Sequence, residues 1–326
     1  MQTNEHENVY TQRREALERL WRTSPELVTT AALMLAVLAV AIGGLAVDPR
    51  TVTGAPAWLK PAKFAVSIAI YTVTLAWIFT FLADWPRLRR VIGWSTAAAM
   101  IIEIAIIVSQ AARGTASHFN VSTPYDGALF MIMGVTIITQ TLSTSAVAVA
   151  LWRQRIADEA MGWALRLGMI LTIVGAMTGG LMTRPTAAQI DAAHAGHRMT
   201  ITGAHTVGAA DGGPGLPGTG WSTTHGDVRI PHFFGLHALQ ALPIVALVLR
   251  RARRRETVRA RLVIVAAASY AALYVILLIQ ALRGVSVVAP DTASLAQLAV
   301  WLIATALAAV AALRDRAAAT HHVAAF

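Results

Sequence analysis

The sequence contains no cysteine and few charged residues. Charged side chains make up 13% of its 326 residues, whereas about 25% is typical of a soluble domain. The absence of cysteine excludes disulfide bonds, thiolate metal sites and covalent attachment of a c-type haem. The shortage of charge, together with a hydrophobic content of 56%, indicates an integral membrane protein.

Long apolar runs are abundant, and eight of them could cross a bilayer about 30 Å thick. We therefore expect an all-α polytopic membrane protein. Its transmembrane helices are predicted near residues 27–47, 63–83, 91–112, 127–151, 161–183, 232–249, 262–282 and 293–313. Residues 1–26 mix Glu and Arg and resemble neither a secretory nor a twin-arginine signal. We expect them to form a short cytoplasmic helix, with residues 314–326 as a cytoplasmic tail.

Several short motifs occur twice. The first motif is Gly43-Gly44-Leu45 followed by Pro49, and it recurs as Gly179-Gly180-Leu181 followed by Pro185. The second is the pair Pro61 and Phe64, which recurs as Pro231 and Phe234. The third is Gln110-Ala111-x-Arg113-Gly114, which recurs as Gln280-Ala281-x-Arg283-Gly284. The first motif recurs after 136 residues and the other two after 170. These spacings predict two tandem parallel four-helix repeats, 27–152 and 161–313. The second contains a long loop insertion, 184–230, between the fifth and sixth helices.

Lysine and arginine concentrate at one set of helix ends. They are frequent in the N-terminal segment, in the tail and in the turns near residues 84–90, 152–159 and 250–261. By the positive-inside rule, these segments and both termini are cytoplasmic, in the inner membrane. The net charge of +10 is then mainly a topology signal with some attraction to anionic lipid, and nucleic acid is not an expected partner. The repeated motifs fall at the opposite helix ends, which predicts an outward-facing site where the halves meet.

Histidine is the main candidate for metal or haem binding. The candidate ligands are His118, His205, His232 and His237; neutral imidazole suits haem iron, copper or zinc. His232 and His237 are five residues apart, about 140° around a helix, so they cannot both bind one ion from a regular face. We expect His237 to lie inside the hydrocarbon region, where a polar ring needs a partner. The competing interpretation of each histidine is a loop side chain that bonds to water.

Two carboxylates are candidate catalytic residues. Glu103 is predicted near the bilayer centre, where an unpaired charge costs several kcal/mol. We expect it to handle protons or to orient His237; the alternative is a protonated carboxyl bonded within the bundle. Asp126 lies at the predicted start of the fourth helix, where a negative charge is favourable. It could instead be an acid or metal ligand beside His118.

Five polar residues are candidates for holding a cofactor. Arg113 and Arg283 occupy equivalent positions after helix ends, each preceded by a glutamine, Gln110 or Gln280. Paired guanidiniums suit haem propionates or a lipid head group, although attraction to the helix dipole would also explain them. Gln240 follows His237 by three residues and could orient it.

The insertion differs in composition from the rest of the chain. Residues 187–197 could form a short amphipathic helix, whereas residues 208–218 are too rich in glycine and proline for helix or regular strand. Long loops of this kind in a compact fold are usually lids, binding loops or disordered segments.

Three functions fit these features. The plan of two parallel four-helix halves with inward histidines is similar to that of haem A synthases, which implies a haem-binding or metal-binding membrane oxidoreductase. Those proteins have histidines in both halves, whereas here the intramembrane histidine is in the second half alone. The alternatives are a zinc-dependent hydrolase or lipid-modifying enzyme that uses His118, Asp126 and His232, and a transporter or ion-binding protein that uses Glu103 and the two arginines. The expected partners are the lipid bilayer and a small-molecule or lipid ligand.

Overall fold

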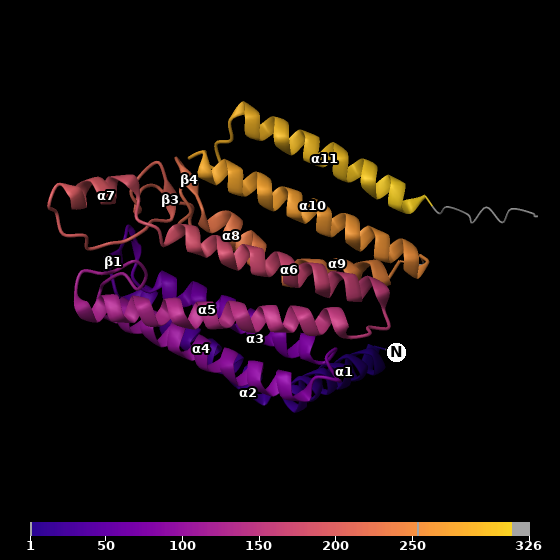
Figure 1. The fold of residues 1–326 in the computed structure, drawn as a ribbon. Helices are drawn as coiled ribbons and strands as arrows, with labels where there is room; N and C mark the ends of the chain where they lie inside the picture. The colour runs from indigo at the N-terminus through magenta and orange to yellow at the C-terminus, as the bar shows by residue number, and fades with distance from the viewer. Residues whose placement is uncertain (1, 253, 315–326) are drawn as a thin grey trace, which may run out of the picture.

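The computed structural model describes residues 2–252 and 254–314, and helices dominate it (Figure 1). Within these ranges, seven helices are long and apolar enough to cross a membrane, and a bent helix pair could form an eighth span. The spans are α2 (Pro25–Val47), α3 (Leu59–Phe79), α4 (Pro86–Ala112), α5 (Pro124–Arg153), α6 (Glu159–Met182), the pair α8 (Arg229–Leu236) and α9 (Ala238–Arg250), α10 (Glu256–Leu282) and α11 (Thr292–Leu313). The prediction of a multi-pass helical protein is confirmed in this form.

The remaining elements are short or lie at the ends. Helix α1 (Gln2–Thr23) precedes α2, and α7 (Ala187–His194) lies in the long insertion. Two antiparallel hairpins pair β1 (Thr51–Val52) with β2 (Ala55–Pro56), and β3 (Thr206–Val207) with β4 (Gly226–Asp227). The predicted tail, 314–326, lies outside the described residues except for Arg314.

Local sequence signals explain where the long helices begin. Proline occupies the first turn of α2, α4 and α5, where its missing N–H costs no hydrogen bond. The side chains of Thr123, Asp158 and Asp291 cap α5, α6 and α11 by accepting hydrogen bonds from backbone amides of the first turn.

The two ends of the bundle differ (Figure 1). At one end, short turns join α3 to α4, α5 to α6 and α9 to α10. We call this the short-turn end; α1 lies beside it. At the other end, the hairpins, α7 and the long loop cover the helices. We call residues 183–228 the cap and this end the capped end.

Helix packing divides the chain into two groups of spans. Helices α2, α3 and α4 contact one another, and α5 packs on α4. In the same way α6, the α8–α9 pair and α10 contact one another, and α11 packs on α10. Contacts between α5 and α6 join the groups. The largest buried apolar cluster crosses this junction toward the short-turn end and includes Phe79, Leu82, Leu151, Leu165 and Leu239.

The sixth predicted helix, 232–249, is not continuous. The axis bends by 45° between α8 and α9, at His237. Two carbonyls beside the bend accept side-chain hydrogen bonds from neighbouring helices: Tyr270 Oη donates to Phe234 O at 2.5 Å and Thr172 Oγ1 donates to Leu236 O at 3.3 Å. Side chains that bond to backbone carbonyls in this way interrupt the helical ladder and bend the axis.

Candidate functional site

One set of polar contacts beneath the cap joins three segments of the first group through His118. His118 lies in the loop between α4 and α5, Lys60 in the first turn of α3, and Glu103 inside α4. Lys60 Nζ is 2.9 Å from His118 Nδ1, and His118 Nε2 is 3.5 Å from Glu103 Oε1. The Glu103 side chain is 3% exposed and the His118 side chain 23%. Lys60, His118 and Glu103 therefore lie one after another, and the Glu103 side chain is buried in a helix long and apolar enough to cross a membrane.

The hydrogen-bonding capacity of lysine determines the tautomer of His118. When Lys60 is protonated it can only donate, so His118 Nδ1 then accepts and the ring proton lies on Nε2, which faces Glu103. Burial lowers the pKa of His118 well below its ordinary value, and the positive charge of Lys60 acts in the same direction. His118 is therefore neutral near pH 7, with one nitrogen toward the cap and the other toward Glu103.

Glu103 has few other partners. Thr136 of α5 places Oγ1 3.5 Å from Glu103 Oε2, and Oε1 has no hydrogen-bond partner among the described residues. The sequence suggested that Glu103 faces His237. The structure instead places Glu103 against His118, because the loop after α4 folds back over the end of its own helix.

Phe119, next to His118, has a strained backbone. Its φ is +64°, a left-handed conformation that is uncommon for bulky residues and costs on the order of 1–3 kcal/mol. The cap holds it there, because Thr202 N donates to Phe119 O at 2.8 Å and the ring packs against His205 at 4.9 Å. This left-handed conformation sets the direction in which the backbone leaves His118.

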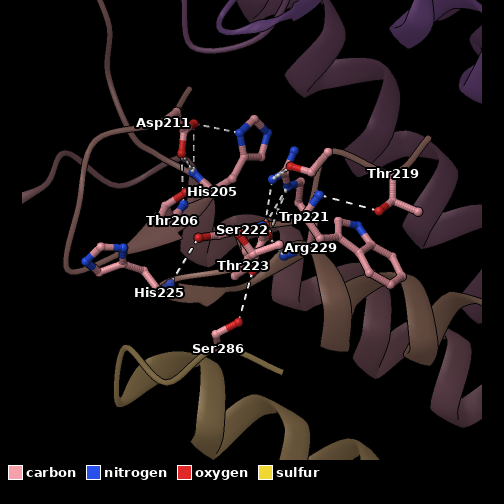
Figure 2. A network of polar contacts seen from close by, with 12 residues as sticks. His205, Thr206, Asp211, Thr219, Trp221, Ser222, Thr223, His225, Arg229 and Ser286 are labelled. Carbon is pink, nitrogen blue, oxygen red and sulfur yellow. Dashed lines mark hydrogen bonds and ion pairs between the residues drawn. The ribbon is translucent and has the colours of Figure 1, made fainter. Parts of the chain in front are cut away.

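The cap contributes a second histidine, His205, paired with Asp211 (Figure 2). His205 Nδ1 is 2.6 Å from Asp211 Oδ2, and the backbone amides of His205 and Thr206 also donate to this carboxylate. Burial alone would raise the pKa of Asp211, but these hydrogen bonds lower it below its usual range. Burial lowers the pKa of His205, and the bond with Asp211 reverses only part of that effect.

The cap is attached to both groups of helices. Lys63 Nζ of α3 donates to Thr219 O at 2.7 Å, and Ser286 Oγ, in the loop before α11, donates to Ser222 O at 3.2 Å (Figure 2). Arg229, which is partly exposed, forms an ion pair with the buried Asp227 at the base of the cap. The insertion is therefore an ordered cover over the His118 site rather than a disordered loop.

His232 and His237 have separate surroundings, in agreement with their spacing. His232 Nδ1 is 2.7 Å from Gly175 O of α6. His237 lies at the bend, with its ring 4.1 Å from the ring of Phe233. Gln240 donates to Thr74 Oγ1 of α3 at 3.3 Å and so links the two groups of helices.

The candidate cofactor residues at the ends of α4 and α10 bond to the segment that follows each helix. Arg113 pairs with Asp126 of α5, and Gln110 Nε2 donates to the same oxygen, Oδ1, at 2.9 Å. In the second group, Arg283 pairs with Asp291, and Gln280 Nε2 donates to Ser286 O. The side chains of Asp126, Arg113 and Arg283 are thus engaged in structural contacts.

Three further histidines lie away from this site. His194 and His197 are exposed, and His225 Nδ1 lies 2.9 Å from its neighbour Thr224 Oγ1. Among the described residues, no group of three or more His, Asp or Glu side chains is arranged to hold a metal ion. The haem or metal cofactor stays a prediction from the sequence.

Sequence reasoning did not single out Lys60 and Asp211. Lys60 precedes the repeated Pro61, so a cation at the entry of an apolar helix was the available signal. Asp211 stands among glycines, and nothing in the sequence connects it with His205.

Comparisons with known proteins assign no function to this chain. No family model matches the chain, and neither a curated protein nor a solved structure matches it.

Proposed function

We propose that this chain is a proton-handling membrane protein, in which His118 relays protons between the capped end and Glu103 inside the bilayer. The observation that carries the proposal is the position of His118 between Lys60 Nζ and Glu103 Oε1. An ionisable residue inside a membrane span commonly marks a proton or ion pathway, and here its contact leads directly to the loop outside the span.

The imidazole can pass a proton without becoming charged for long. The Lys60 ammonium gives a proton to Nδ1 while the proton on Nε2 moves to the Glu103 carboxylate. The ring is left as the other neutral tautomer, and Lys60 regains a proton from the capped side. One proton enters and one leaves, and no oxidant or reductant is required. The 3.5 Å separation on the Glu103 side has to shorten, or a water has to bridge it, for transfer.

This arrangement supports the transporter or ion-binding class among the three functions predicted from the sequence. A metal ion at His118 would have to displace the Lys60 ammonium from Nδ1 or enter between Nε2 and Glu103. The haem-binding oxidoreductase and the zinc hydrolase remain predictions. A Soret band in the purified protein, lost in His237→Ala, would support the haem-binding one.

The proposal includes the duplicated architecture and the topology. The ends of α4 and α10 support the duplication. After α4, Gly114 has a φ of +70° and Thr115 N donates to Gln110 O. After α10, Gly284 has a φ of +74° and Val285 N donates to Gln280 O. This is the same helix-ending motif in both groups. The arginine-rich short-turn end is then cytoplasmic, and the capped end faces outward.

Hydrogen–deuterium exchange of the Glu103 carboxyl tests the relay. Infrared titration of the purified protein in nanodiscs follows the C=O band of protonated carboxyls, and Glu103→Gln should remove one component. His118→Asn should slow deuterium exchange of that component at least about tenfold, the low end of general acid–base effects. Glu159→Gln removes an exposed carboxylate at the short-turn end and should change nothing. An unchanged exchange rate in His118→Asn would overturn the relay.

A further inference from the structure

A second carboxylate is buried at the opposite end of the bundle. Glu26 lies in the first turn of α2 and is 9% exposed. Its Oε1 accepts a hydrogen bond from Ser24 Oγ at 3.0 Å and lies against Gly93 of α4. A Cβ at position 93 would be 1.9 Å from this oxygen, so only glycine leaves room for the carboxylate there.

Glu26 makes no ion pair with the residues that the structure describes. Within the part of the chain that the structure describes, no lysine, arginine or histidine nitrogen lies within ion-pair distance of it. Two buried carboxyl groups thus lie along α4: Glu26 packs against its Gly93, in the first half of the helix, and Glu103 belongs to α4 itself, ten residues after Gly93.

Thr96 lies between these two carboxylates on α4. It is fully buried, and its hydroxyl has no hydrogen-bond partner in the structure. Position 96 is three residues after Gly93 and seven before Glu103; a separation of seven keeps two side chains on nearly the same helix face, about 10 Å apart. A buried hydroxyl without a partner is a common position for an internal water.

The segment between Thr96 and Glu103 is apolar but adaptable. Met34 of α2 and Met100 of α4 pack there in one cluster. Methionine is unbranched and flexible, so its side chain can move aside for water without separation of the helices. Both side chains belong to the apolar packing between α2 and α4.

We propose that the first group of helices contains a proton path across the membrane, from His118 and Glu103 through water at Thr96 to Glu26. This inference rests on the proposed relay, because Glu103 is the inner end of that relay. Protons move along the path between hydrogen-bonded waters and the two carboxyls, which are protonated in turn, and no covalent product forms. Glu26 is the group that exchanges protons with the short-turn side.

Proton flux into liposomes tests the path. The full chain is reconstituted with a pH-sensitive dye inside, and a potassium gradient with valinomycin supplies the driving potential. We expect flux above that of empty liposomes and at least a tenfold loss in Glu26→Gln and in Thr96→Val. Thr96→Ser keeps the hydroxyl and should retain flux, and Glu159→Gln is the matched carboxylate control. Wild-type flux in both Glu26→Gln and Thr96→Val would overturn the path.

The infrared exchange measurement separates this inference from the relay itself. In Glu26→Gln, the Glu103 band should still exchange through His118, which also shows that the variant is folded. If the wild-type protein shows His118-dependent exchange but no flux above empty liposomes, the path is refuted and the relay stands. If exchange is independent of His118, the relay is refuted whatever the flux.

Discussion

Gly175 of α6 and Gly235 of α8 pack with their backbones in contact, and a Cβ on Gly175 would lie 2.6 Å from Gly235 Cα. Small residues permit such close approach between membrane helices. This contact fixes α8 just before the bend at His237. We predict that Gly175→Ala destabilises the protein by about 1–3 kcal/mol, the usual cost of overpacking.

Gly180→Ala, on the same helix, is the matched control, since a Cβ there would meet nothing within 4 Å. Thermal unfolding in detergent should show a lower midpoint for Gly175→Ala and no loss for Gly180→Ala. Equal midpoints for the two variants would contradict the close packing.

The two carboxylates that pair with Arg113 and Arg283, Asp126 and Asp291, should differ in their contribution to stability. The Asp126 side chain is 3% exposed and also binds Gln110 and Thr123, whereas the Asp291 side chain is 37% exposed. We predict that Asp126→Asn costs about 1–3 kcal/mol, as for buried hydrogen bonds to a charged group. Asp291→Asn should cost under about 1 kcal/mol, as for an exposed ion pair. Unfolding midpoints of the two variants provide the comparison, and a larger loss in Asp291→Asn would refute it.

His118 should make stability depend on pH. The folded state lowers the pKa of His118, so below about pH 6.5 the unfolded chain binds a proton that the folded chain does not. The stabilising contribution is complete above that pH and is lost as the pH falls, by up to about 1.4 kcal/mol per pH unit. His205 acts in the same direction.

The contribution of His118 is isolated by substitution, because Lys60 and Glu103 also face this ring. Between pH 7 and 5 the unfolding midpoint should fall less steeply in His118→Gln than in wild type. His194→Gln changes an exposed histidine of α7 and should keep the wild-type slope. If the midpoint of His118→Gln falls with pH as steeply as that of the wild type, the folded state does not lower the pKa of His118.

The bond between His205 and Asp211 should hold the cap closed. Asp211 accepts from a ring nitrogen and two backbone amides, so Asp211→Asn removes the charge that these donors share. We predict severalfold faster cleavage within residues 208–218 by a nonspecific protease. Asp191→Asn, at an exposed position of α7, should be cleaved at the wild-type rate. Equal rates for the two variants would mean that Asp211 does not restrain the cap.

Much of the fold could be predicted from the sequence. The apolar runs predicted each span to within a few residues, and α7 forms where residues 187–197 were expected to be helical. The bend at His237 was not predicted, and the side chains that bond to the carbonyls beside it, Tyr270 and Thr172, lie on other helices. Of the side chains that meet beneath the cap, the sequence singled out His118, His205 and Glu103 but not Lys60, and it placed Glu103 against His237 where the structure has His118.

The sequence by itself determined the chemical limits and the local geometry: the absence of thiolates, apolar helices long enough to cross a membrane, and the glycine ends after Gln110 and Gln280. These properties depend on composition and on neighbours within a few residues. Only the tertiary structure decided that Lys60, Glu103 and His118 meet. Transmembrane helices are apolar on most of their faces, so no polar periodicity shows how each one is rotated, and close packing between helices sets that rotation.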